Sequence, residues 1–214
     1  MPKFQCQVCD IPFEVPQKAL DKYSDWVPKY CRDHSPKKGT SQQKKRRFNF
    51  ASREENLTRA EVLTKYLDGP DSGMFTDGSA TPNPGPGGWG MVWVENNDIR
   101  MEKYGHESGN TTNNRMELTA LLRAYESLPQ DMEIPVFTDS RLCVDTITKW
   151  APGWEKKGWK RAGAPLKNLD LVQPLLDLYR AHHKCPLQWI EAHSAYRWNE
   201  YADCLATAWL RSEV

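Results

Sequence analysis

Hydrophobic and polar positions alternate regularly from about residue 73 to the end of the chain. Short apolar runs predict five strands, at residues 74–76, 91–95, 100–104, 134–138 and 187–191. Apolar positions at helical spacing predict four helices, at residues 115–128, 140–150, 170–182 and 197–211. Three strands come first, and helices and strands alternate after them. This order predicts the α/β class, with a mixed five-stranded sheet flanked by helices.

The N-terminal third lacks this alternation. We predict four parts: an N-terminal module at residues 1–35, a basic flexible linker at 36–52, a connecting helix at 53–70 and the main domain at 71–214. The linker is rich in Pro, Gly, Ser, Gln and basic residues and has no apolar periodicity. The connecting helix is predicted from Ser52 and Glu55, which have the spacing of a capping box. Asp170 and Gln173 have the same spacing before the third helix of the main domain.

Charge and composition set limits on the class of protein. The 214 residues carry a net charge of only +1, so no overall field favours nucleic acid. The basic run at residues 44–47 is compatible with a solvated linker, with phosphate contacts or with a nuclear signal. No run of 18 apolar residues and no secretion signal occurs, so we expect no membrane span and a soluble, intracellular protein, cytoplasmic or nuclear. The six cysteines are then expected to be reduced.

Four acidic residues lie in segments that place them at the edge of the predicted core. Asp77 and Asp139 each follow a short apolar run, whereas Glu117 and Asp203 lie in helical patterns. A carboxylate at the edge of a core is costly unless it is paired or binds a metal. If the four converge, they suggest a site for hard divalent cations, which prefer oxygen ligands. The alternative is that each acid is a helix cap or an ordinary surface group.

The N-terminal module contains a second set of candidate metal ligands, Cys6-x-x-Cys9 and Cys31-x-x-His34. Four soft or borderline ligands in two pairs fit a tetrahedral zinc ion. So short a segment cannot bury enough core by itself, and a bound metal would supply most of its stability. Residues 4–13 resemble small zinc-ribbon domains, although these more often have a fourth cysteine where His34 stands. Unpaired reduced cysteines are the alternative.

Three glycines, Gly85, Gly87 and Gly90, have the spacing of a dinucleotide-binding fingerprint. That fingerprint requires a helix directly after the glycines, with its N-terminus against the pyrophosphate. Here residues 91–94 continue as a strand pattern, and prolines interrupt the loop. The dinucleotide interpretation therefore fails.

Four ordered segments between residue 73 and the C-terminus resemble the type 1 ribonuclease H family. They are residues 76–88, residues 111–118, residues 138–140 and the pair His193 and Asp203. Members of that family cut RNA that is paired to DNA. The resemblance implies a ribonuclease H-like fold and an endonuclease that hydrolyses the RNA strand of RNA–DNA hybrids by two-metal-ion catalysis. The implied products carry 5′-phosphate and 3′-hydroxyl ends.

The resemblance also implies catalytic roles. Two Mg²⁺ ions, which Mn²⁺ could replace, would be bound by four carboxylates: Asp77, Glu117, Asp139 and Asp203. His193 would assist proton transfer or product departure. The loop at residues 194–198 departs from the family, which usually has glycine and a second histidine there, so we expect a stiffer loop.

Contacts with the hybrid follow from the same resemblance. A carboxamide both donates and accepts hydrogen bonds, as the RNA 2′-hydroxyl does, so we expect three asparagines to recognise RNA: Asn83, Asn113 and Asn114. Thr112 stands at a position used for a DNA phosphate. Residues that resemble the basic protrusion of the family are expected to bind without sequence preference: Trp150, Trp154, Lys156, Lys157 and Lys160. A turn role for Asn83 and a packing role for both tryptophans are alternatives. Arg141 replaces a residue more often amide-like in the family, and it has no assigned role.

Functions of other classes are alternatives. A non-catalytic hybrid-binding protein would be expected to lack at least one of the four carboxylates, and none is missing. A protein-docking adaptor would act through the N-terminal module, whose role, extra grip on the hybrid or docking to another protein, stays open. A reverse-transcriptase fragment or an integrase relative is disfavoured because no polymerase segment precedes the domain. We expect a monomer whose partners are an RNA–DNA hybrid and, through the module, a protein.

Overall fold

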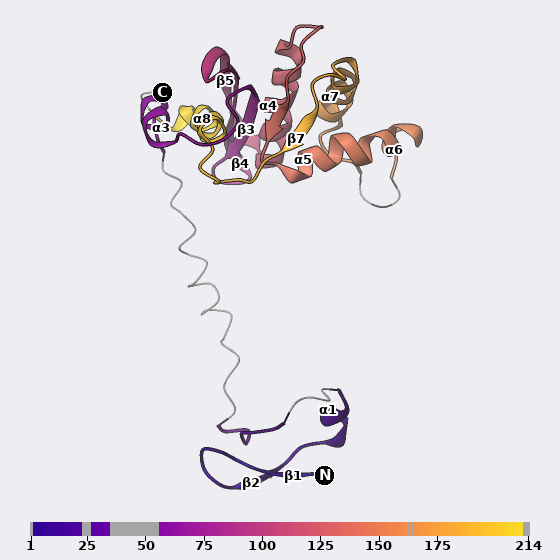
Figure 1. The fold of residues 1–214 in the computed structure, drawn as a ribbon. Coiled ribbons are helices and arrows are strands. Elements are labelled where there is room, and N and C mark those ends of the chain that lie inside the picture. Colours follow the sequence, from indigo (N-terminus) through magenta and orange to yellow (C-terminus); the bar gives the residue numbers. More distant parts are fainter. Residues whose placement is uncertain (1, 23–26, 35–55, 162, 164, 212–214) are drawn as a thin grey trace. The chain divides into compact units, whose positions relative to one another are not determined.

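The computed structural model describes residues 2–22, 27–34, 56–161, 163 and 165–211 (Figure 1). The chain divides into two compact units, Met1–Glu55 and Asn56–Val214. The predicted linker at residues 36–52 lies outside the described residues. Within the described residues, no helix has the length and apolar character needed to cross a membrane.

The N-terminal unit is built on a hairpin of two short strands, β1 (Lys3–Gln5) and β2 (Pro12–Glu14). The strands pair antiparallel with Phe4 opposite Phe13, and the two ring centroids lie 6.2 Å apart. A helix, α1 (Gln17–Lys22), follows. In the described part of this unit, the buried apolar side chains are those of Cys6, Val15 and Pro28. Such a core is too small to hold the unit together without a further crosslink.

The second unit is built on a mixed five-stranded sheet, as predicted. Its strands are β3 (Gly73–Ala80), β4 (Gly85–Glu95), β5 (Asp98–Thr111), β6 (Val136–Thr138) and β7 (Leu187–Trp189). The order across the sheet is β5-β4-β3-β6-β7, antiparallel from β5 to β3 and parallel from β3 to β7. The first three strands are longer than predicted, because glycines in β4 and charged residues on the edge strand β5 hide the apolar alternation. The continuation of β4 through the glycines confirms that they do not open a helix.

Helices flank the sheet. They are α4 (Asn113–Ser127), α5 (Arg141–Asp145), the π-helical turn η1 (Thr146–Trp150), α6 (Ala151–Lys156), α7 (Leu169–Ala181), α8 (Arg197–Ala206) and the 3₁₀ turn η2 (Ala208–Leu210). The four predicted helices are present. The second, however, continues through η1 and α6, and the last ends before η2, because Thr207 leaves the helical conformation.

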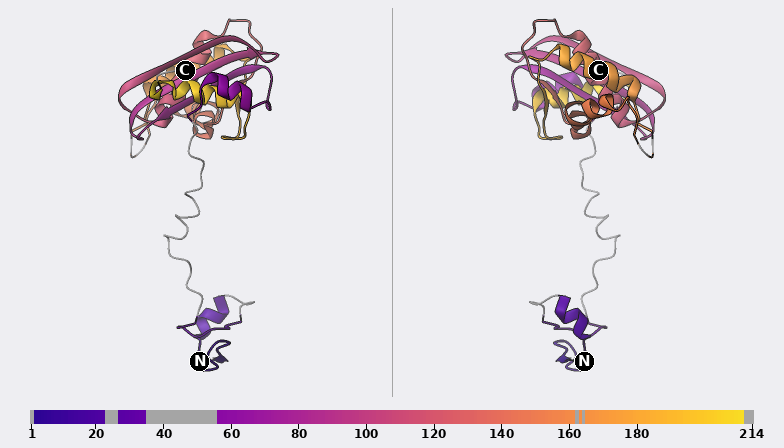
Figure 2. Two further views of the ribbon diagram at one scale, coloured as in Figure 1. Left: turned by 90° about the vertical axis from the view of Figure 1, so that its left-hand side faces the viewer. Right: turned by 90° about the vertical axis from the view of Figure 1, so that its right-hand side faces the viewer.

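Neighbouring residues of β3 serve two separate hydrophobic clusters, because side chains along a strand alternate between the faces of a sheet. Met74 packs with Leu121 of α4 and Leu175 of α7. Phe75 packs with Tyr201 of α8 in the other cluster. Thus α4 and α7 cover one face and α8 covers the opposite one. Figure 2 shows α8 toward the viewer on the left and α7 toward the viewer on the right.

The predicted connecting helix at residues 53–70 is wrong in its bounds. The helix observed there, α3, covers Arg59–Lys65, and residues 56–58 precede it in non-helical conformation. Its capping box is formed by Thr58 and Glu61 rather than by Ser52 and Glu55, which lie outside the described residues. Val62 is 1% exposed and packs in the hydrophobic cluster that contains Phe75 and Tyr201, so α3 is part of the second unit.

The predicted capping box before α7 is also wrong. The N-cap is Asn168, at a φ of 56°, and it makes no side-chain cap bond. Asp170 instead accepts two hydrogen bonds from the guanidinium of Arg115 on α4, at 3.0 and 2.6 Å. A planar guanidinium satisfies both carboxylate oxygens at once, which a backbone amide does not. The pair therefore joins α4 to α7.

Two glycines let helices approach the sheet closely. A Cβ on Gly78 would lie 2.2 Å from the amide nitrogen of Glu117, and one on Gly90 would lie 2.5 Å from Cβ of Leu205. Real Cβ atoms do not tolerate such contacts, so any side chain would push α4 or α8 outward. The absence of a side chain at these positions brings residues of both helices next to β3.

We expect Gly78→Ala to lower the free energy of unfolding by about 1–3 kcal/mol, the usual cost of overpacking, because its Cβ would collide with the backbone of α4. Denaturant unfolding monitored by circular dichroism measures this. Gly109→Ala on β5 is the matched control, since no atom lies within 4 Å of the position its Cβ would take. Equal stability losses in the two variants would contradict the close-approach argument.

Candidate active site and metal centres

Three of the four predicted carboxylates meet at one edge of the sheet. In the parallel pair β3 and β6, Thr76 lies opposite Thr138, so Asp77 within β3 and Asp139 directly after β6 lie at the same level. Glu117 reaches them from α4 because Gly78 admits its backbone against β3. Each of the three acids offers a carboxylate oxygen, and these oxygens all lie within 4.8 Å of one another. We call these three residues the acidic triad.

Asp203 adjoins the acidic triad from α8. It does not belong to the group of oxygens within 4.8 Å, but its negative charge contributes to raising the pKa of Asp77. Its negative charge also contributes to raising the pKa of Glu117. Glu117 comes from the α4 side of the sheet and Asp203 from the α8 side, so the strand that carries Asp77 lies between them. The structure thus brings all four predicted acids to one site.

Burial and mutual repulsion change the acidity of this site. Asp77 is 7% exposed, and its burial, followed by the charges of the other three acids, raises its pKa well above the usual range. Burial and the charge of Asp139 do the same to the pKa of Glu117. Burial also raises the pKa of Asp139, although the amide of Asn199 and the charge of His193 oppose this. The site therefore resists full ionisation, and a divalent cation would relieve it.

Asp139 is held in place by two residues to which the sequence assigned no role. The side-chain Nδ2 of Asn199 donates to its Oδ2 at 3.3 Å, and Nε1 of Trp189 donates to its carbonyl oxygen at 2.9 Å. Asn199 is 3% exposed. It lies four residues before Asp203, so helical periodicity puts both on one face of α8, and that spacing was the available signal. Trp189 gave no such signal, because its contact depends on how β6 and β7 pair.

His193 lies within electrostatic range of Asp139, since its charge helps to lower the pKa of that residue. Its side chain is exposed, and its backbone has a φ of 53°. Ala195, two residues later, has a φ of 61°. Residues other than glycine pay a steric penalty in this left-handed region, so the loop keeps its shape only where its surroundings hold it.

A cleft of about 830 Å³ lies between α4 and the helices from α5 to α7. Five of the predicted substrate contacts line it: Asn83, Thr112, Asn114, Trp150 and Trp154. It is also lined by Arg161, Lys167 and Asn168, none of which is among the predicted substrate contacts. The backbone turn before α7 brings Lys167 and Asn168 to the cleft, and no local pattern announces it.

The remaining predicted contacts lie outside this cleft. Lys156, Lys157 and Lys160 are exposed on and after α6. Asn113 uses its Oδ1 to accept the amide N–H of Ala80 at 2.8 Å, which leaves its amide NH₂ group as a donor. Its own backbone N–H donates to Oδ1 of Asn83 at 3.3 Å. Both carboxamides are therefore oriented by the protein itself.

The two tryptophans differ in exposure. Trp150 is 42% exposed. Trp154 is partly buried and packs against the hydrophobic cluster that contains Leu121 of α4 and Leu175 of α7. Their ring centroids lie 6.2 Å apart. Glu155 accepts two hydrogen bonds from Arg180 of α7, at 3.0 and 2.8 Å, which ties α6 to the body of the domain. Trp154 thus has a packing role, and Trp150 offers an open aromatic face.

In the N-terminal unit, Cys6, Cys9, Cys31 and His34 bring their ligand atoms within 4.8 Å of one another. The Sγ atoms of Cys9 and Cys31 are 3.9 Å apart, and His34 Nδ1 is 3.3 and 3.8 Å from the Sγ atoms of Cys31 and Cys6. A tetrahedral zinc ion with Zn–S bonds of about 2.3 Å has S···S edges of about 3.8 Å. Burial raises the pKa of Cys6, but backbone N–H groups outweigh it and lower the value to about 6, which favours the thiolate. The donor set and its spacing fit zinc.

Comparison with known proteins gives one consistent family. A family model described as RNase H matches residues 70–211. A ribonuclease H of Chelativorans sp. strain BNC1 is 45% identical over 136 residues, which cover 63% of this chain and 82% of that protein. A ribonuclease H of Mycolicibacterium smegmatis is 45% identical over 142 residues, covering 66% and 88%.

Solved structures agree. LC9-RNase H1, described as a type 1 RNase H with the type 2 active-site motif, has a TM-score of 0.53 at 28% identity and covers 66% of this chain and 74% of its own. The PFV RNase H domain has a TM-score of 0.55 at 23% identity, covering 64% and 93%, and shows the fold alone. Residues 1–69 lie outside the family match.

We expect Asp77→Asn to stabilise the metal-free protein, and increasingly so as the pH rises. A carboxyl whose pKa is raised by folding stabilises the fold below the unfolded value of about 4, and this stabilisation is lost as the pH rises through the folded value. The variant removes that loss, worth about 1.4 kcal/mol for each unit of pKa shift.

Thermal unfolding with a chelator present, from pH 4 to pH 8, measures the difference between variant and wild type. The exposed Asp131→Asn is the control and should behave as wild type at every pH. A constant difference between Asp77→Asn and wild type across this range would contradict the raised pKa.

Proposed function

The chain belongs to the ribonuclease H family, and we propose that its four clustered carboxylates bind two Mg²⁺ ions for hydrolysis of the RNA strand of RNA–DNA hybrids. The observation that carries the proposal is the acidic triad, whose oxygens lie within 4.8 Å of one another in the region matched by the family. As a member of this family the chain is an enzyme, a ribonuclease H. The products carry 5′-phosphate and 3′-hydroxyl ends.

The site fits hard divalent cations. Asp77, Glu117, Asp139 and Asp203 supply oxygen donors alone, which suits Mg²⁺, with Mn²⁺ as a substitute. When bound, the two ions lower the pKa of the attacking water and stabilise the leaving 3′ oxygen. Burial and mutual repulsion raise the pKa of the most buried acids, so cation binding is expected to favour their ionised form and to be coupled to proton release.

The other residues of the site position groups and move protons. Asn199 and Trp189 hold Asp139 by its carboxylate and its backbone, so that it keeps its place when the hybrid arrives. His193 stands at an exposed position within electrostatic range of Asp139, where its imidazole takes a proton during hydrolysis or assists the departure of the product.

The cleft beside the site is the proposed seat of the hybrid. The carboxamides of Asn83, Asn113 and Asn114 recognise the 2′-hydroxyl, the group that distinguishes RNA from DNA. Thr112 binds a phosphate of the DNA strand. Arg161 and Lys167 add positive charge to the cleft, and the exposed face of Trp150 packs on sugar. Lys156, Lys157 and Lys160 act from outside by releasing counterions from phosphates.

The N-terminal unit is proposed to hold one structural Zn²⁺ through Cys6, Cys9, Cys31 and His34. The bound ion replaces the core that this unit lacks. We propose that the unit adds grip on the hybrid; docking to another protein is the second candidate, since the exposed Val8 and Ile11 form an apolar edge. That the chain acts as a monomer stays a prediction.

We expect the full chain to cleave the RNA strand of a labelled hybrid in Mg²⁺ and to leave double-stranded DNA and double-stranded RNA intact. Asp139→Asn should reduce cleavage to background, because the cation site loses a charged ligand. Gel analysis of the labelled strand measures both, with the exposed Asp131→Asn as a control that retains wild-type activity. A hybrid left uncleaved over a range of Mg²⁺ and Mn²⁺ concentrations would contradict the proposed function.

We expect one equivalent of zinc in the purified full chain, lost in the double variant Cys9→Ser, Cys31→Ser and kept in His106→Ala, which changes an exposed histidine of the other unit. Native mass spectrometry measures the content. Zinc retained by the double variant would contradict the ligand assignment.

Deleting residues 1–52 separates the two candidate roles of the N-terminal unit. If the unit grips the hybrid, the deletion weakens hybrid affinity while cleavage persists at saturating substrate. If affinity is unchanged, the unit serves docking.

A further inference from the structure

A segment outside the family match is built into the catalytic domain. The family match begins at residue 70, yet residues 56–69 pack on the sheet domain. This segment consists of α3 with its flanking residues, and we call it the strap. Its central side chain, Val62, is 1% exposed in the cluster that contains Phe75 and Tyr201. The strap is therefore a fixed part of the domain.

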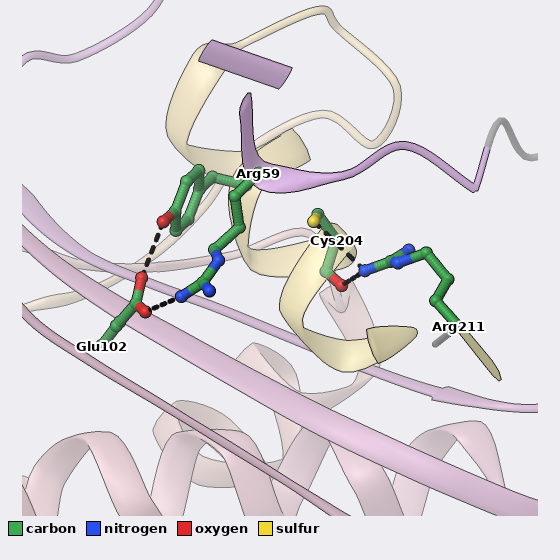
Figure 3. Close-up of polar contacts among 5 residues, drawn as sticks. Arg59, Glu102, Cys204 and Arg211 are labelled. Carbon is green, nitrogen blue, oxygen red and sulfur yellow. Dashed lines mark hydrogen bonds and ion pairs between the residues drawn. The ribbon is translucent and has the colours of Figure 1, made fainter. Parts of the chain in front are cut away.

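Polar contacts hold the first half of the strap against β5 and α8. Arg59 donates to Glu102 of β5, and Tyr201 of α8 donates to the other oxygen of the same carboxylate at 2.7 Å (Figure 3). Arg211 donates to the side chain of Asn56 and, as Figure 3 shows, to the carbonyl oxygen of Cys204 at the end of α8. Three segments distant in sequence thus converge on the strap.

The second half of the strap holds the loop that follows His193. The Nε of Arg197 donates to the carbonyl oxygen of Tyr66 at 2.7 Å, and the amide of Arg197 donates to the carbonyl oxygen of Asp68 at 2.8 Å. Asp68 and Tyr196 also form a parallel β-bridge. A Cβ on Gly69 would lie 2.9 Å from Cβ of Tyr196, so the two backbones lie as close as a glycine allows.

This loop needs a brace. His193 and Ala195 both have left-handed backbone conformations, at φ values of 53° and 61°, which neither residue type prefers. Such conformations persist only where surrounding contacts outweigh the alternatives. The contacts that immediately follow Ala195 are those of Tyr196 and Arg197 with the strap.

We propose that the strap positions His193 for catalysis, with Arg197 as the residue that couples the two. The inference rests on the proposed role of His193 in the hydrolysis. Arg197 touches no reacting group; it clamps the C-terminal end of the loop to the carbonyl oxygens of Tyr66 and Asp68, and this fixes where the His193 imidazole stands relative to Asp139. Without the clamp the loop relaxes toward ordinary backbone conformations and the imidazole leaves its place.

The first test is kinetic. Arg197→Ala in the full chain should lower kcat for hybrid cleavage about 10-fold, a part of the 10²- to 10⁴-fold that a general acid or base contributes, with KM within about twofold. Arg197→Lys, which keeps a cationic donor, should recover part of the loss. Arg123→Ala is the matched control, because Arg123 forms an exposed ion pair with Glu126 on α4.

The decisive comparison is made in a His193→Ala background. If Arg197 acts through His193, adding Arg197→Ala there causes no further loss of kcat, because effects of residues that act as one unit are not additive. A further 10-fold loss in that background, or an unchanged kcat in the single variant, overturns the proposal. If Arg197→Ala does not fold, as judged by circular dichroism, Arg197→Lys is taken through the same comparison.

Amide hydrogen exchange separates this inference from the proposed function. Arg197→Ala should speed exchange at residues 193–197 at least about 10-fold and leave α4 unchanged, whether or not the hybrid is cleaved. Unaltered exchange in the loop overturns the strap proposal. Absence of cleavage by the wild-type chain overturns the proposed function instead.

Discussion

The repulsion among carboxylates that share one partly buried site is the constraint on which the catalytic unit depends. Each carboxylate would be better solvated if it faced water. Their burial and closeness raise the pKa of Asp77 and Glu117 well above the usual range. The fold holds them together nevertheless, at a cost in stability that a divalent cation is suited to remove. Because these carboxylates repel one another without a cation, binding of a cation is expected to stabilise this part of the fold.

Several unrelated features of the fold serve that closeness. Parallel pairing of β3 and β6 aligns two of the acids, and the missing side chains of Gly78 and Gly90 admit α4 and α8 to the sheet. Both clusters of apolar side chains press helices onto the strand that carries Asp77, one from each face. The stabilisation from apolar burial on both faces of the sheet thus offsets the repulsion among the carboxylates.

The two candidate metal sites offer contrasting sets of ligand atoms. The carboxylate site offers hard oxygen donors at the edge of a large core. The group formed by Cys6, Cys9, Cys31 and His34 offers sulfur and imidazole donors, and the described part of its unit has almost no hydrophobic core. A soft, closed ligand set suits a structural ion, whereas oxygen ligands leave coordination positions for water and substrate.

The amino-acid sequence alone determined the features that depend on local pattern. Apolar periodicity located the five strands and the helices of the domain, and short motifs located Asp77, Glu117, Asp139 and Asp203, because each acid sits at a strand end or on a helix face. The two Cys/His pairs were equally local. Helix starts were predicted less well: Ser52 and Asp170 have the spacing of caps, but spacing does not reveal that Thr58 caps α3 or that Asp170 binds Arg115.

Only the tertiary structure decided which distant residues meet. Asn199 holds Asp139 from 60 residues away, and Arg197 reaches the carbonyl oxygen of Tyr66 across 131 residues. Lys167 and Asn168 enter the cleft through a turn that has no periodic signal. Such contacts leave no mark on local composition, because they depend on the register of strands and the packing of helices. Those in turn follow from burial summed over the whole domain.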